Sequence, residues 1–139
     1  MGQLVRERYG RRAALIGFST YTGTVTAASE WGGPAERKVI RPALAESYEA
    51  LLHETGRSNF LVSWQHGGFL ADALSEPRLE RAIGVIYLPE TERLSHYFPA
   101  RLFEPFDAIV HCDHTSSVQP LDAPTERPAE EAETFSSGM

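Results

Sequence analysis

The stretch LIGFSTYTGTVTAASEWGGPAER, residues 15–37, decides the fold expected for this chain. It overlaps an apolar run, Ala13 to Phe18, that is typical of a buried strand. The β-branched residues of Thr24 to Thr26 also favour extended backbone. Gly23 interrupts the segment where the backbone must bend or approach another group closely, and Trp31-Gly32-Gly33-Pro34 ends it. We therefore expect a strand that leads into a polar loop.

The rest of the chain alternates between helical and extended patterns. Residues Gln3 to Tyr9 predict the end of a short helix that Gly10 stops, and Ser47 is suited to cap a helix that ends at Gly56. Four further elements are expected: a short helix over Phe69 to Leu74, and strands over Asn59 to Trp64, Ile83 to Leu88 and Ala108 to Cys112.

This alternation predicts an α/β fold with a mixed, mostly parallel sheet and flanking helices. The excursion from Ile16 to Ala28 is short enough to add an antiparallel hairpin to that sheet. Residues 1–119 are expected to form the domain. Residues 120–139 contain prolines and glutamates with little apolar content, which predicts a solvated or disordered acidic tail.

Composition excludes several classes of protein. The 139 residues suffice for one core, and no apolar run approaches the ~20 residues of a membrane span. The N-terminal residues lack the pattern of a secretory signal, and the single cysteine, Cys112, excludes an internal disulfide, so a cytoplasmic protein is expected. A formal net charge of -6 argues against nucleic acid as a partner.

The opening stretch also resembles a long block of the erythromycin esterase family, and further blocks follow it in order. They are Arg41–Leu44, Ser47–Leu51, Arg81–Tyr87, Pro89–Arg93, Ser95–Phe98, Phe106–His111 and, weakly, Glu133–Phe135. The resemblance implies a metal-independent carboxylic ester hydrolase of α/β fold that needs no cofactor. Some members open macrolide lactone rings, which links the family to antibiotic resistance.

The resemblance covers only the C-terminal part of that family. Its principal catalytic His motif stands before the segment that matches Gly2 to Tyr9, and the family usually has Val where this chain has Met1. Residues 1–119 are therefore expected to be an incomplete portion of the larger fold, with Met1 at an internal Val position. The expected partners are a small ester or macrolide in the intact protein, and the missing N-terminal half or a second copy.

Three groups of residues are candidates for contact with a substrate. Hydroxyls of the loop segment, among them Thr20, Tyr21 and Thr24, would line a cleft at the carboxyl end of the first strand, or would serve only local turns. Glu30 and Trp31 would offer a carboxylate and a stacking surface, or Trp31 would anchor the loop. His96 and Tyr97 would contact substrate or support the site, or would be structural.

The run His111-Cys112-Asp113-His114 contains metal-ligand residue types but no standard zinc spacing. In a strand His111 and Asp113 point to one face and Cys112 to the other, so ordinary hydrogen bonding is expected and no metal. The roles of His111, Cys112 and His114 stay open.

No Gly-x-Ser-x-Gly motif surrounds Ser19. No residue matches the family's principal catalytic His, and the chain alone is therefore expected to be inactive. We expect a C-terminal fragment of an erythromycin esterase-like hydrolase that supplies core strands and part of the substrate cleft. The alternatives are a non-enzymatic binding or assembly module, and an independent hydrolase that uses His96, His111 or His114 as base.

Overall fold

The computed structural model describes residues 2–64, 76–102 and 104–119. Their elements, in chain order, are α1 (Gly2–Tyr9), the 3-10 turn η1 (Gly10–Arg12), β1 (Ile16–Ala27), β2 (Glu36–Ile40), α2 (Tyr48–His53), β3 (Asn59–Ser63), β4 (Arg78–Arg81), α4 (Glu92–Ser95), β5 (Tyr97–Ala100) and β6 (Ala108–Thr115). In these ranges no helix has the length and apolar character needed to cross a membrane.

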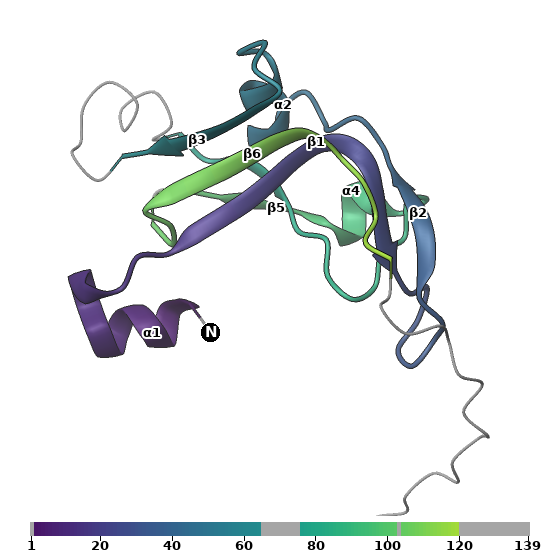
Figure 1. Cartoon of the computed structure of the whole chain (residues 1–139), viewed down its shortest axis with the longest axis horizontal. Coiled ribbons are helices and arrows are strands. Elements are labelled where there is room, and N and C mark those ends of the chain that lie inside the picture. The colour runs from purple at the N-terminus through teal and green to yellow at the C-terminus, as the bar shows by residue number, and fades with distance from the viewer. Residues whose placement is uncertain (1, 65–75, 103, 120–139) are drawn as a thin grey trace, which may run out of the picture.

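Four strands form one sheet in the order β2-β1-β6-β3 (Figure 1). β1 pairs in parallel with β6, so that Phe18 lies opposite Val110, while β2 and β3 are antiparallel to their neighbours. β4 and β5 form a separate antiparallel ribbon. The expected mixed α/β class is confirmed. The segment from Ile16 to Ala28 is not a hairpin by itself, because Ile16 to Ala27 form the single strand β1, whose antiparallel partner is β2.

Two further expectations, about strand direction and about the segment Ile83 to Leu88, were wrong in detail. Among the described strands one pair in the main sheet is parallel and two are antiparallel, so the sheet is not mostly parallel. The segment Ile83 to Leu88 is not a strand. It meets the end of β1 only at the isolated bridge between Ile86 and Ala28, because the chain leaves the sheet again at Pro89, which has no N–H to continue a ladder. The predicted helix over Phe69 to Leu74 and the predicted tail, 120–139, lie outside the described residues.

Local sequence explains the helices. Ser47 caps α2, since its hydroxyl accepts the backbone N–H of Ala50 at 3.2 Å. α1 has no buried residue and lies off the sheet in Figure 1. Its tether is Arg6, which donates to Asp107 at 2.5 Å, while the same carboxylate accepts the N–H of Leu15 at 2.7 Å.

The two faces of the sheet differ. Tyr48 and Leu52 of α2 pack with Ile109 of β6 in one core cluster, and this covers one face. The other face leaves large apolar side chains in solvent, among them Phe18 at 80% and Leu61 at 59% exposure. The described chain therefore buries only one side of its main sheet.

Candidate functional site

A buried arginine organises the polar interior. The Arg81 side chain, 1% exposed, stands at the end of β4 and pairs with Glu92 of α4 at 3.0 Å. One terminal nitrogen also donates to the carbonyl of Arg41 at 2.8 Å. The other donates to the carbonyls of Thr20 at 2.6 Å and Tyr21 at 2.9 Å. Arg81 thus joins the β4–β5 ribbon to the middle of β1.

Glu49 of α2 accepts the backbone N–H of Arg81, and two tyrosines, Tyr87 and Tyr97, lie beside the same arginine. We call these five residues the Arg81 cluster: Arg81, Glu49, Glu92, Tyr87 and Tyr97. Tyr87, fully buried, donates its hydroxyl to Glu92 at 2.7 Å, and burial together with that carboxylate raises the pKa of its phenol. The Arg81 guanidinium lies 5.7 Å from the ring centre of Tyr97. Burial raises the pKa of Tyr97 as well, and its hydroxyl accepts the N–H of Leu44. Both phenols are therefore held as neutral hydrogen-bonding groups.

A cavity of about 190 Å³ lies beside the cluster. Its lining comes from β1, β6, α2, the end of β4 and the segment that follows β4. It comprises Phe18, Ser19, Thr20, Glu49, Arg81, Ile83, Cys112 and Thr115. Burial raises the pKa of Glu49, and the backbone N–H of Arg81 opposes that shift. We call this space the β1 cavity.

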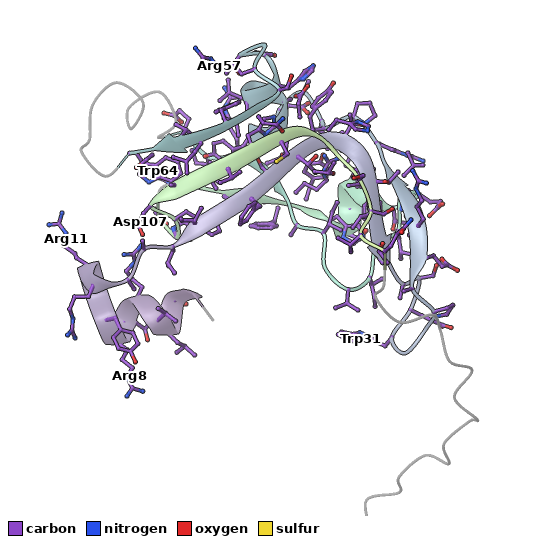
Figure 2. The ribbon with its side chains drawn as sticks, in the orientation of Figure 1. Arg8, Arg11, Trp31, Arg57, Trp64 and Asp107 are labelled. Carbon is purple, nitrogen blue, oxygen red and sulfur yellow. The ribbon has the colours of Figure 1, made fainter. Side chains whose placement is uncertain are left out.

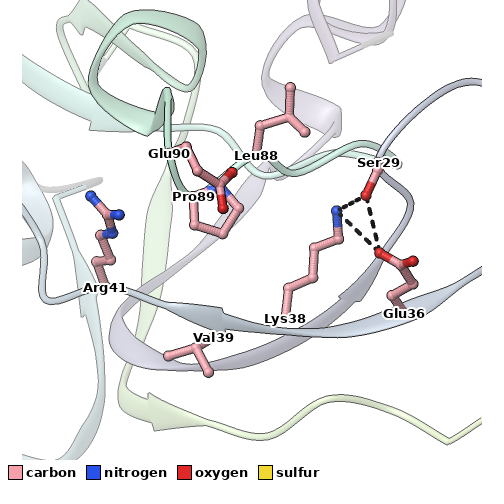
Figure 3. A pocket seen from close by; sticks show the side chains of 8 residues that line it. All are labelled: Ser29, Glu36, Lys38, Val39, Arg41, Leu88, Pro89 and Glu90. Carbon is pink, nitrogen blue, oxygen red and sulfur yellow. Dashed lines mark hydrogen bonds and ion pairs between the residues drawn. The ribbon is translucent and has the colours of Figure 1, made fainter.

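A second cavity of about 380 Å³ lies against β2 and the loop that carries Pro89 (Figure 3). Lys38 crosses its floor and donates to Ser29 at 2.8 Å and to the carbonyl of Tyr87 at 2.7 Å. Glu36 accepts from the same serine at 3.0 Å. Glu90 and Arg41 line the cavity without a side-chain bond between them in Figure 3, so they offer one carboxylate and one guanidinium to a ligand.

Thr20, Tyr21 and Thr24 lie within β1 and not in the polar loop predicted after Phe18, because the β-branched run continues the strand to Ala27. Their hydroxyls do not gather at one place. Thr20 lines the β1 cavity and shares its hydroxyl with Thr115 at 3.1 Å. Tyr21 lies toward α2, where its ring stacks on His53 with centroids 3.7 Å apart. Thr24 accepts the N–H of Ser117 at 2.9 Å. Thr20 lines the β1 cavity, and Tyr21 and Thr24 do not.

The other predicted residues are equally dispersed. Glu30 and Trp31 lie in the turn between β1 and β2, where Trp31 is 83% exposed (Figure 2). His96 accepts the N–H of Leu88 at its Nε2, 3.0 Å away, and its Nδ1 lies 3.2 Å from the carbonyl of Ala82. Tyr97 belongs to the Arg81 cluster. The structure thus brings Thr20 and Tyr97 to Arg81 and leaves Trp31 at the hairpin tip.

A polar chain runs under α2 from β1 to β6. The Ser19 hydroxyl lies 2.9 Å from Nδ1 of His111, and Asp113 lies 3.4 Å from Nε2 of the same ring. Asp113 also binds Nδ1 of His53 at 2.6 Å, so the chain of polar contacts reaches α2. His111 has no solvent exposure, so it is not placed to act on a water at the surface. Within the described part of the chain, no three His, Cys, Asp or Glu side chains are grouped to hold a metal ion.

His111 should make stability depend on pH. Burial lowers its pKa, and the interactions with Asp113 offset this only in part. As the pH falls through the ordinary value for histidine, about 6.5, the unfolded chain therefore takes up this proton before the folded chain does. We expect the free energy of unfolding to decrease with that fall in pH, and His111→Gln to flatten the decrease.

Urea unfolding at closely spaced pH values measures the effect. His114→Gln, at an exposed position of the same strand, is the matched control and should keep the parent profile. The same pH dependence in the parent and in His111→Gln would show that His111 is not responsible.

The central residues of the site were not among the predicted site residues. Arg81 and Glu49 stand in blocks that resemble the family, but neither had a predicted role. One signal was present: Arg81 directly precedes the apolar run that begins at Ala82. A charged side chain that is buried beside such a run needs hydrogen-bonding partners. Nothing local to the sequence indicated that those partners come from β1 and α4.

Comparisons with known proteins agree with this architecture. The model of the family described as erythromycin esterase matches residues 1–115. A solved structure described as a succinoglycan biosynthesis protein is similar at 28% identity, with a TM-score of 0.69 over 83% of this chain. A Bacillus cereus protein of 20% identity shares the fold, also with a TM-score of 0.69 over 83% of this chain. This chain covers 27% and 28% of those two proteins. Because the family model spans most of its length, this chain belongs to the erythromycin esterase family.

Proposed function

We propose that this chain acts as the C-terminal part of an erythromycin esterase-like hydrolase. In that role it supplies core strands and one wall of the substrate cleft, while the base that activates water comes from outside residues 1–139. The substrate class is a carboxylic ester, with macrolide lactones as one form. Two features support the proposal: membership of the family and the small share of each solved relative that this chain covers.

One structural observation carries the proposal: over half its length β1 has β6 as its sole strand partner among the described strands. Arg81 and the N–H of Ala43 bind carbonyls at Thr20 and Tyr21, near the end of this stretch. β2 pairs only with Gly23 to Ala27, and on that side of β1 no described strand pairs with Ile16 to Thr22. The face beside this edge exposes Phe18 and Leu61. A sheet with an unpaired edge and an uncovered apolar face favours the addition of further chain.

The cleft wall would be formed from the two cavities. The β1 cavity contains Thr20 and opens beside the unpaired part of β1, and the cavity in Figure 3 adjoins the turn that carries Glu30 and Trp31. In this proposal Thr20 lines the first part of the wall, while Tyr21, stacked on His53, and Thr24, bonded to Ser117, support the strand that carries it. Glu30 and Trp31 contact substrate from the hairpin tip, and His96 with Tyr97 supports the loop between them.

Ester hydrolysis by two proteins tests the proposal. One is the 139-residue chain, and the other is the longer product translated from the in-frame DNA that precedes Met1. We expect the shorter protein to hydrolyse neither an aryl ester nor erythromycin, and the longer protein to hydrolyse at least one. Turnover by residues 1–139 alone that is lost on His114→Ala would instead support an independent hydrolase.

The open edge of β1 also favours a second candidate, a non-enzymatic module that binds a partner by strand addition. That function requires residues 1–139 to form a stable folded protein that captures its partner without turnover. An in-frame stop codon directly before Met1, together with a stable monomer, would favour it over the hydrolase.

A further inference from the structure

Glu49 is a buried carboxyl group with one unused oxygen. The residue is 2% exposed, and its Oε1 accepts the backbone N–H of Arg81 at 3.0 Å. Its Oε2 makes no hydrogen bond with any described residue. Burial raises the pKa of Glu49 and the nearby Ser47 hydroxyl opposes that rise, but this hydroxyl is the cap that accepts the N–H of Ala50. Since buried polar groups in folded proteins are almost always paired, this oxygen points to a missing donor.

The nearby cation is already committed. The Arg81 guanidinium donates to Glu92 and to the carbonyls of β1, while only its backbone amide serves Glu49. The carboxylates Glu49 and Glu92 therefore share one buried positive charge. Glu80 stands next to Arg81 in β4, and its pKa is raised by burial and by the charge of Glu49. When Glu49 and Glu92 are both ionised, this excess of negative charge favours one more cation over a neutral donor.

The β1 cavity provides the space for that cation. Its volume of about 190 Å³ is several times the ~30 Å³ of a water molecule. Phe18 and Ile83 give it apolar walls, and Glu49 lies among its lining residues. The cavity adjoins the stretch of β1 that no described strand pairs on the side away from β6.

We propose that the β1 cavity receives an arginine side chain from the segment that covers the open edge of β1, and that its guanidinium donates to Oε2 of Glu49. This inference rests on the proposed function. Arginine fits better than lysine, because its guanidinium is weakly hydrated and suits buried carboxylates. Its methylene stem would pack against Phe18 and Ile83.

Ethylguanidinium, with its neutral analogue ethylurea, tests the charge requirement on the full 139-residue chain. Each is titrated at mildly alkaline pH while nuclear magnetic resonance follows the backbone amide of Arg81, which is bonded to the same carboxyl group. We expect a saturable shift with ethylguanidinium and binding at least about tenfold weaker with ethylurea. Glu49→Gln should remove this preference.

Glu80→Gln is the matched control, because it removes an adjacent carboxylate that does not line the β1 cavity, and it should keep the preference. Equal binding of the two probes would overturn the inference in favour of a neutral donor. Absence of binding by either probe to the folded chain would overturn it as well. These results do not depend on hydrolysis, so a longer protein without esterase activity would contradict the proposed function and leave the guanidinium site standing.

Discussion

Replacing Arg81 by methionine should lower the free energy of unfolding more than the removal of any other single charge. The substitution leaves Glu92 buried without its cation and removes the Arg81 donor from the carbonyls of Thr20 and Arg41. The carbonyl of Tyr21 loses the same donor and keeps the N–H of Ala43. Breaking a buried ion pair from one side costs about 3–5 kcal/mol. That loss is comparable with the whole stability of a small domain, about 5–15 kcal/mol. The urea midpoint followed by circular dichroism measures it.

Arg57→Met is the matched control, because Arg57 is exposed at the margin of the molecule (Figure 2). It should change the unfolding free energy by about 0.5 kcal/mol or less. Arg81→Lys should recover little of the loss, since an ammonium group does not reproduce the fork of donors that reaches β1 and α4 together. A stability of Arg81→Met close to that of Arg57→Met would show that the cluster does not hold the ribbon to the sheet.

Among substitutions of small residues, Gly23→Ala should cause the largest loss of stability. Gly23 has φ of 134°, a conformation that residues with a Cβ rarely adopt. An added Cβ would lie 2.7 Å from the backbone N and 2.8 Å from the backbone C of Thr115, and would overlap its carbonyl oxygen. Neither backbone can move without opening the parallel pair of β1 and β6. We expect a loss of about 3 kcal/mol or more, measured by thermal unfolding.

Gly56→Ala separates the two causes. Gly56 also has positive φ, 69°, but nothing lies within 4 Å of the position its Cβ would take. Only the backbone penalty applies there, about 1–2 kcal/mol. Equal losses at Gly23 and Gly56 would show that the contact with Thr115 contributes nothing.

The sequence predicted elements whose cause is local. Ser47 begins α2 as expected, because a cap acts within one turn of helix. The helix ends at His53, before Gly56, whose positive φ belongs to the turn that follows. β1, β3 and β6 follow from their apolar and β-branched runs. The segment from Ile83 to Leu88 has the composition of a strand but is not one. Only Ile86 forms a bridge, with Ala28, and Pro89 lacks the N–H that would continue the ladder.

The site was less predictable, because long-range contacts create it. Thr20 and Tyr97 are 77 positions apart in the sequence (97 − 20) and meet only through Arg81. Trp31 and His96 are suitable residue types for a cleft, but turn geometry leaves the former in solvent and backbone groups engage the latter. The order of strands in the sheet was also not predictable, since β3 pairs with β6 and not with its neighbours in the sequence.

The central claim is that the open edge of β1 is where the rest of an esterase-like fold packs. Amide hydrogen exchange of Ile16 to Thr22 tests it most directly, compared between residues 1–139 and the longer in-frame product. Ile109 to Cys112 of β6, paired on both sides, serves as the internal reference. The account predicts that amides at the open edge exchange rapidly in the shorter protein and much more slowly in the longer one. Unchanged exchange at this edge, with β6 protected in both proteins, would contradict it.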